Sequence, residues 1–324
     1  MKKLISGAIA LVMLFTSMFA GASLAEEKKT SVVTTIFPIY DWVREIVGDN
    51  DNVEITLLLD SGVDLHSYQP TAQDILKIAE CDVFAYVGGE SDEWVEGALA
   101  QSVNPDMVVM NLMDALGEAV MAEETVEGME AEEEEEEAEE GEGEIEYDEH
   151  VWLSLRNAQA LVKVLANALG EADPAHAESY AANADAYAEE LAALDAEYAS
   201  AREAADFDTV LFGDRFPFRY LTDDYDLNYY AAFSGCSAET EASFETVAFL
   251  AGKVDELGLT SVLTIEGTNH RIAETVVAST QAKDAAILAL DSMQGITAGD
   301  VADGATYIGI MTDNLEVLKQ ALAK

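Results

Sequence analysis

The stretch SVVTTIFP at residues 31–38 sets the fold of the first half of the chain. Its β-branched residues predict a strand that ends near Pro38. Residues 39–47 follow with helical spacing and stop at Gly48, and a second strand is expected at 53–59. A strand, a helix and another strand in this order form the repeating unit of parallel sheets.

The same alternation extends along the rest of the chain. Further strands are predicted at 83–87, 107–110, 209–212, 227–233, 261–265 and 286–290. Between the two runs of strands, residues 174–202 are rich in strong helix formers, with no Gly or Pro after Pro174, which predicts one long helix. We therefore expect an α/β protein of two similar lobes, each a mostly parallel sheet flanked by helices, joined by a long rigid linking helix.

The first residues have the pattern of a secretory signal. Lys2 and Lys3 precede a short apolar run, and small residues up to Ala25 form a cleavage site. We expect residues 1–25 to be removed on export, to the periplasm or the cell surface. The apolar run does not end in a cysteine, so the usual lipoprotein attachment is not expected. The predicted divisions of the chain are 1–25, an N-terminal lobe at 26–172, the linking helix at 173–204 and a C-terminal lobe at 205–324.

The charge of the chain limits its partners. The formal net charge is -48, which argues against nucleic acid, because phosphate binding requires a basic surface. Residues 118–149 carry many carboxylates and no Lys or Arg. Such a segment repels itself, so a mobile acidic loop is expected there. A low-affinity collector of cations and a solvated spacer are both open interpretations of it.

Two of the four histidines stand where a ligand would bind. His66 lies in DLHSYQP, after a predicted strand, and His150 lies in DEHVWL, before a predicted helix. Open α/β sheets place ligands at such strand and helix ends, and neutral imidazole binds transition metals. Spacing alone leaves open that these are two unrelated loop residues. His176 is expected on the surface, and His270 in a loop or helix cap.

The other chemically active residues carry weaker signals. Cys81 and Cys236 could pair after export, but their positions in different predicted lobes favour two separate thiols. No phosphate-cradling glycine loop, no Gly-x-Ser-x-Gly turn and no His-Glu-x-x-His helix occurs in the sequence. We therefore do not expect an enzyme.

Around the two histidines the chain resembles the solute-binding proteins of zinc and manganese ABC importers, the zinc-uptake and adhesin-type lipoprotein family. The matching stretches span nearly the whole mature chain. They are TTIFP at 34–38, DLHSYQPT at 64–71, residues 82–88, HVWL at 150–153, and Asp291 after a late strand.

The resemblance implies a metal ion held between the lobes by His66, His150 and Asp291. It also implies a third ligand, His or Glu, at the position that Gly213 occupies here. Glycine has no side chain to coordinate with, so this sequence departs from the family pattern. Asp214 is the expected substitute. Other candidates are Glu239, Glu241, Cys236 and a water molecule.

The predicted function is capture of a divalent metal ion and delivery to the permease of an ABC importer, by a chain expected to be a monomer. Zinc is the favoured cargo and manganese the second candidate. Two alternatives stay open. One is a secreted binding or adhesion protein whose metal site has degenerated. The other is a secreted metal-dependent hydrolase with a reactive water at the missing ligand position.

Overall fold

The structure is a computed structural model that describes residues 29–130, 145–237, 241–267 and 269–324. Its N-terminal lobe is built on a four-stranded parallel sheet in the order β2-β1-β3-β4. The strands are β1 (Thr30–Thr34), β2 (Val53–Leu57), β3 (Val83–Tyr86) and β4 (Val108–Asn111). They correspond to four of the predicted strands.

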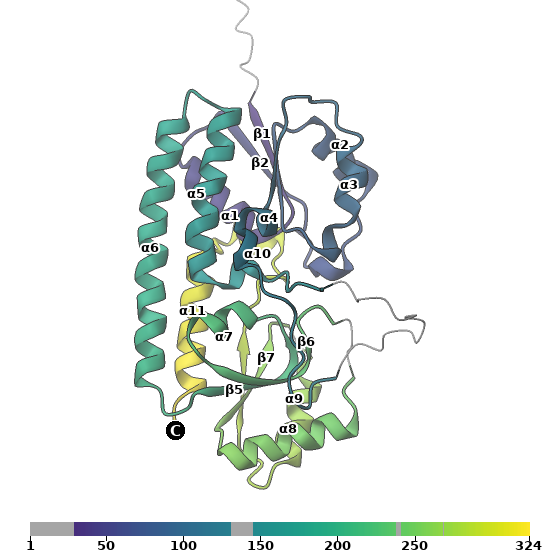
Figure 1. The fold of residues 1–324 in the computed structure, drawn as a ribbon, viewed down its shortest axis with the longest axis vertical. Coiled ribbons are helices and arrows are strands. Elements are labelled where there is room, and N and C mark those ends of the chain that lie inside the picture. Colours follow the sequence, from purple (N-terminus) through teal and green to yellow (C-terminus); the bar gives the residue numbers. More distant parts are fainter. Residues whose placement is uncertain (1–28, 131–144, 238–240, 268) are drawn as a thin grey trace, which may run out of the picture.

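The C-terminal lobe repeats this arrangement. Its parallel sheet has the order β6-β5-β7-β8, and its strands are β5 (Thr209–Phe216), β6 (Asn228–Ser234), β7 (Ser261–Ile265) and β8 (Ala286–Leu290). Two similar α/β lobes are therefore present, and the predicted fold class is confirmed (Figure 1). Strand β5 runs four residues further than predicted, because an irregularity between Phe212 and Arg215 lets it continue its pairing with β6.

Helices surround both sheets (Figure 1). Those of the N-terminal lobe are α1 (Phe37–Val47), α2 (Ala72–Glu80), α3 (Trp94–Leu99), α4 (Leu112–Leu116) and α5 (Leu155–Ala172). Those that follow the linking region are α7 (Arg219–Asp224), α8 (Phe244–Leu257), α9 (Arg271–Ser279), α10 (Ala298–Ala302) and α11 (Tyr307–Ala321).

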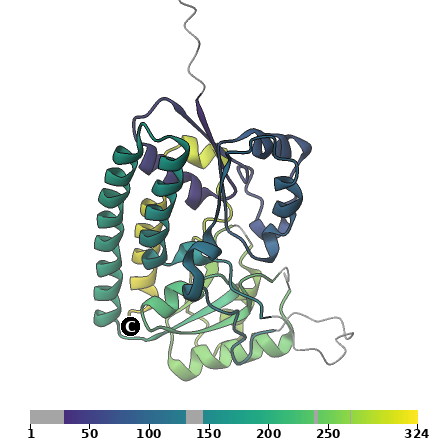
Figure 2. The ribbon, with the colours of Figure 1, turned by 45° about the horizontal axis from the view of Figure 1, so that its top comes forward.

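One long helix, α6 (Ala177–Ala204), lies beside both lobes (Figures 1 and 2). It begins three residues after Pro174, where the predicted helix would start. Near its beginning, the Tyr180 hydroxyl accepts a hydrogen bond from Asn50 in the N-terminal lobe, at 2.7 Å. Near its end, the Tyr198 hydroxyl donates to the Met311 carbonyl of α11, at 2.6 Å. The predicted division of the chain into lobes and a linking helix at residues 173–204 stays a prediction. Helix α6 covers most of that range.

The two lobes share one apolar core. It continues from the N-terminal sheet through α6 and α11 to residues of β5. Tyr307 is fully buried where they meet. Its ring lies edge-on to Trp42 at 5.1 Å, and its hydroxyl donates to the Trp152 carbonyl at 2.6 Å. Its backbone N–H donates to Asp41 of α1 at 2.7 Å. Apolar burial and satisfied polar groups thus hold the lobes in one arrangement.

The described part of the acidic segment crosses between the lobes. The Met121 N–H donates to the Tyr220 hydroxyl at 3.0 Å, and Glu130 forms a bridge with Phe233 at the edge of β6. The expected mobile loop at 118–149 stays a prediction, since residues 131–144 lie outside the described residues, as does the expected signal at 1–25. Within the described ranges, no helix has the length and apolarity needed to cross a membrane.

Candidate metal centre

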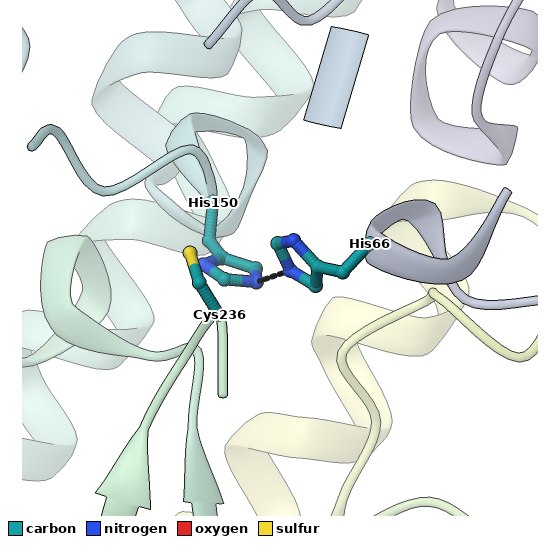
Figure 3. A group of neighbouring side chains, drawn as sticks. All are labelled: His66, His150 and Cys236. Atoms are coloured by element: carbon teal, nitrogen blue, oxygen red, sulfur yellow. Dashed lines mark hydrogen bonds between the residues drawn. The ribbon is translucent and has the colours of Figure 1, made fainter. Parts of the chain in front are cut away.

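His66 and His150 meet between the lobes. His66 lies in a 3₁₀ turn, Leu65–Ser67, that follows β2, and its N–H donates to Asp64 at 3.0 Å. His150 immediately precedes a second 3₁₀ turn, and its N–H donates to Asp148 at 2.8 Å. The two Nε2 atoms lie 3.2 Å apart, and Figure 3 shows them pointing toward each other from two tilted rings. The predicted convergence of the two imidazoles is thus present in the structure.

Polar groups behind each ring orient it. His150 Nδ1 lies 3.0 Å from Asp148 Oδ1. Because an ionised carboxylate only accepts, Nδ1 carries the proton and Nε2 keeps its lone pair. His66 Nδ1 contacts Ser91 Oγ at 2.7 Å and Glu149 Oε2 at 3.5 Å. Carboxylates behind imidazole rings are typical of metal-binding histidines, since they fix the tautomer that coordinates.

The environment keeps His66 uncharged. Burial, followed by the neighbouring His150, lowers the pKa of His66 to about 3. His150 is itself fully buried. The two Nε2 atoms lie at hydrogen-bonding distance from each other, and with both lone pairs available they could instead bind one cation.

A third donor joins the two rings from the C-terminal lobe. Among the described residues, His66, His150 and Cys236 form a group whose ligand atoms all lie within 4.8 Å of one another. Cys236 follows β6 and is half-buried. Burial, and after it the carboxylates of Asp148 and Glu123, raise the pKa of its thiol above the ordinary value.

Both cysteines are free in the structure, as the separate-thiol interpretation expects. Cys81 is fully buried in the N-terminal lobe, where its Sγ donates to the Ile78 carbonyl at 3.2 Å. Burial raises the pKa of the Cys81 thiol to about 12, and among the described residues Cys81 is not part of a group of metal-binding side chains. Only Cys236 contributes to the group around the histidines.

Two of the three donors, His66 and Cys236, line an acidic cavity of about 230 Å³. Its lining includes four carboxylate side chains, those of Glu90, Glu123, Glu146 and Glu149. A concave surface lined by one sign of charge concentrates counter-ions near it. The mouth of the site therefore favours the approach of cations over anions.

Asp291, the ligand expected from the C-terminal lobe, is not one of the three donors in this group. It lines a separate cavity of about 450 Å³ together with Asp64, Arg215 and Glu266, and this cavity shares no lining residue with the one beside the histidines. Burial and the nearby Glu266 raise the pKa of Asp291 to about 6. Its role as a ligand stays a prediction.

Two of the other candidates for the place of Gly213, Asp214 and Glu241, are not part of the group that His66, His150 and Cys236 form. The Asp214 carboxylate accepts backbone hydrogen bonds, from Arg215 at 2.9 Å and from Ile265 at 3.4 Å. Glu241 is exposed and pairs with Arg271 at 3.7 Å. Glu239 lies outside the described residues.

The two remaining histidines lie outside the group. His176 pairs with Asp173 at 2.7 Å at the start of α6, and His270 precedes α9, as expected for a surface residue and a helix cap. Sequence reasoning missed Ser91 and Arg215, and it ranked Cys236 below Asp214. The signal that could have raised Cys236 is its place directly after a predicted strand, at the sheet edge where ligands bind.

Asp92 fixes the loop that carries Ser91, and its charge gives a pH-dependent prediction. Its carboxylate accepts from Val87 N and Gly88 N, both at 3.0 Å. Burial raises the pKa of Asp92 from 3.8 to about 7. Between these values the folded protein binds more protons than the unfolded chain. The free energy of unfolding contributed by Asp92 therefore falls as pH rises from about 4 to about 7.

Asp92→Asn should remove this dependence, because the amide oxygen can accept both backbone bonds without a charge. In urea unfolding of the metal-free protein, the variant should be more stable than the wild type at pH 8, on the order of 2 kcal/mol, and equal to it at pH 4. Asp106→Asn, at an exposed position, serves as the control. Parallel pH profiles for wild type and Asp92→Asn would contradict the prediction.

Comparison with known proteins gives the chain a family context. The family model for the zinc-uptake complex component A, periplasmic, matches residues 32–321. The chain is 31% identical to the zinc-binding lipoprotein AdcA of Streptococcus pneumoniae over 294 residues, which is 90% of this chain and 56% of that protein. It is 30% identical to the high-affinity zinc uptake system protein ZnuA of Bacillus subtilis over 302 residues, 93% of this chain and 90% of that protein.

A solved structure gives the same result. The Zn(II)-bound ZnuA-like domain of Streptococcus pneumoniae AdcA superposes with a TM-score of 0.70 at 27% identity, covering 91% of this chain and all of that domain. The chain thus spans little more than half of AdcA, and its likeness lies with the ZnuA-like domain.

Proposed function

The chain belongs to the family of the zinc-uptake complex component A, and from this premise we propose that it captures a zinc ion between its lobes and delivers it to an ABC importer. The observation that carries the proposal is the pair of Nε2 atoms at 3.2 Å, from His66 and His150. Tetrahedral zinc with two imidazole ligands places their nitrogens about 3.3 Å apart, given Zn–N bonds of about 2.0–2.1 Å. The pair is thus spaced for one ion.

The surroundings of the pair support the same function. The imidazoles lie in a buried space behind an acidic mouth that attracts cations. Residues from both lobes approach the ion, so binding would strengthen the contact between them. A permease that distinguishes the loaded form from the empty one needs such a difference. The named relatives bind or take up zinc, which favours zinc over manganese as the cargo.

The proposal places the mature chain outside the cytoplasm, as a binding protein and not an enzyme. Gly213 motivated the alternative of a degenerate site, and the three-donor group argues against it, because a decayed site would not keep three converging donors. The hydrolase alternative would lose its basis if the chain bound zinc tightly and was inactive in a hydrolase screen.

The experiment has two parts. The metal-free mature chain, titrated with zinc against a chromophoric chelator, should bind one ion per chain with high affinity and gain thermal stability, because a ligand that binds only the folded state stabilises it. Host cells that lack the chain should take up radioactive zinc more slowly at limiting concentration, while manganese uptake is unchanged. A chain without zinc affinity would overturn capture, and unchanged uptake would overturn delivery.

A further inference from the structure

The family's third ligand has not simply been lost at Gly213, because the structure leaves no space for a side chain there. A Cβ atom on Gly213 would lie 2.5 Å from the Ala273 Cα and 2.8 Å from the Ala273 Cβ. Helix α9, which carries Ala273, packs directly on β5 at this point. No ligand can therefore extend from residue 213 while α9 keeps its position, and a third protein ligand has to come from another position.

The adjacent strand supplies one. Gly235 and Cys236 follow β6, the strand that pairs with β5. A Cβ on Gly235 would lie 2.9 Å from the His150 Cε1 and 2.9 Å from the Phe216 carbonyl oxygen. The backbone at Gly235 thus lies against the edge of the imidazole, which only glycine permits. The next residue, Cys236, lies beside His150 (Figure 3).

The topology of the two lobes explains why this position is suited to a ligand. Strand β2 has the same place in its sheet as β6 has in the other. His66 follows β2, and Cys236 follows β6. Since the carboxyl ends of parallel strands meet at one edge, each lobe presents one donor from the loop after its equivalent strand.

Arg215 holds these two loops together. Its guanidinium forms an ion pair with Asp64, two residues before His66, at 2.6 Å, and donates to the Ser237 carbonyl at 3.3 Å. Both bonds are partly shielded from solvent. The Arg215 side chain therefore fixes the loop that carries His66 relative to the loop that carries Cys236. Arg215 is a positioning residue.

We propose that Cys236 is the third protein ligand of the cargo ion, in place of the side chain that position 213 cannot carry, and that its thiolate makes the site select zinc over manganese. This inference rests on the proposed function of His66 and His150. Binding forms a Zn–S bond and releases the thiol proton to solvent. Thiolate is a soft ligand that zinc accepts readily, whereas manganese prefers carboxylate, carbonyl and water oxygens.

The dimensions fit a zinc site of this type. With a Zn–S bond of about 2.3 Å and Zn–N bonds of about 2.0–2.1 Å, the sulfur of a tetrahedral site lies about 3.6 Å from each nitrogen. One ligand atom of each residue lies within 4.8 Å of those of the other two. Binding of one ion by all three residues would require the Cys236 side chain to turn toward the point between the two rings.

Cobalt(II) provides the test, because it occupies zinc sites and reports its ligands by absorption. The cobalt-loaded mature chain should show a thiolate-to-cobalt charge-transfer band in the near ultraviolet, and Cys236→Ser should lose this band. Cys81→Ser, which changes a buried thiol outside the group, should keep it. Cys236→Ser should also weaken zinc binding at least 100-fold and leave the weak binding of manganese unchanged, so that the preference for zinc narrows.

The outcomes separate this inference from the proposed function. The wild type could bind cobalt and zinc through its histidines, show no charge-transfer band and lose no zinc affinity in Cys236→Ser. In that case the thiolate ligand is wrong and zinc capture stands. If the wild type binds neither metal, both proposals are wrong. Cys236→His, which replaces the thiolate by an imidazole, should restore part of the zinc affinity without the charge-transfer band, which a purely structural role for Cys236 would not produce.

Discussion

His150→Ala should weaken zinc binding by at least about 1000-fold. Loss of an outer-shell partner of a metal ligand typically costs about 10–100-fold in affinity, and removal of the ligand itself should cost more. His150 is the centre of the group, since it is fully buried, faces the His66 Nε2 at 3.2 Å and is held by Asp148. The measurement is a zinc titration against a chromophoric chelator.

Two further variants test whether a loss of zinc binding in His150→Ala merely reflects a loss of stability. Because the ring of His150 is fully buried, alanine leaves a cavity that could destabilise the metal-free protein. His66→Ala, whose side chain is 10% exposed at the rim of the site, should reduce zinc affinity with less loss of stability. His176→Ala removes a histidine outside the group, which pairs with Asp173 at the start of α6. This control variant should bind zinc as the wild type does. Wild-type affinity in His150→Ala would place the ion elsewhere.

Gly213→Ala should destabilise the metal-free protein by about 3 kcal/mol, at the upper end of the range for overpacked interiors. The added Cβ would come within 2.5 Å of the Ala273 Cα, a backbone atom that cannot move unless α9 shifts. Thermal or urea unfolding measures the loss. Gly213→His, which restores the side chain that the family resemblance implies, should be destabilised further and should not bind zinc more tightly.

Gly252→Ala is the matched control for this prediction. Gly252 lies inside α8, and a Cβ there would meet nothing within 4 Å. Alanine is the better helix former by about 1 kcal/mol, so this variant should be as stable as the wild type or slightly more stable. If Gly213→Ala were equally harmless, the space at residue 213 would be larger than the structure indicates, and a side chain at that position could still reach the ion.

The sequence was sufficient for the fold because its signals are local and repeated. Strand patterns at each of the eight positions agree with β1 to β8, since an alternation of strands and helices admits few topologies. The predicted end of β5 was wrong by four residues. There the strand continues through an irregularity opposite β6, and pairing across a sheet is not visible in the strand's own residues.

The candidate site was predicted less completely. The motifs DLHSYQP and HVWL located His66 and His150, because each has a fixed place at the end of a strand or the start of a helix. Asp214 was preferred to Cys236 because it is adjacent to Gly213 in sequence. Backbone N–H groups hold its carboxylate instead, and such bonds depend on the neighbouring strand and not on the residue itself.

The sequence by itself determined two parallel-sheet lobes and two histidines placed to meet between them, since hydrophobic periodicity and ligand motifs are written along the chain. Only the tertiary structure decided which third donor reaches them. That choice depends on the packing of α9 against Gly213, on the close approach of Gly235 to His150 and on the Arg215 ion pair with Asp64. These contacts join residues far apart in the chain, and their distances follow from how the elements pack.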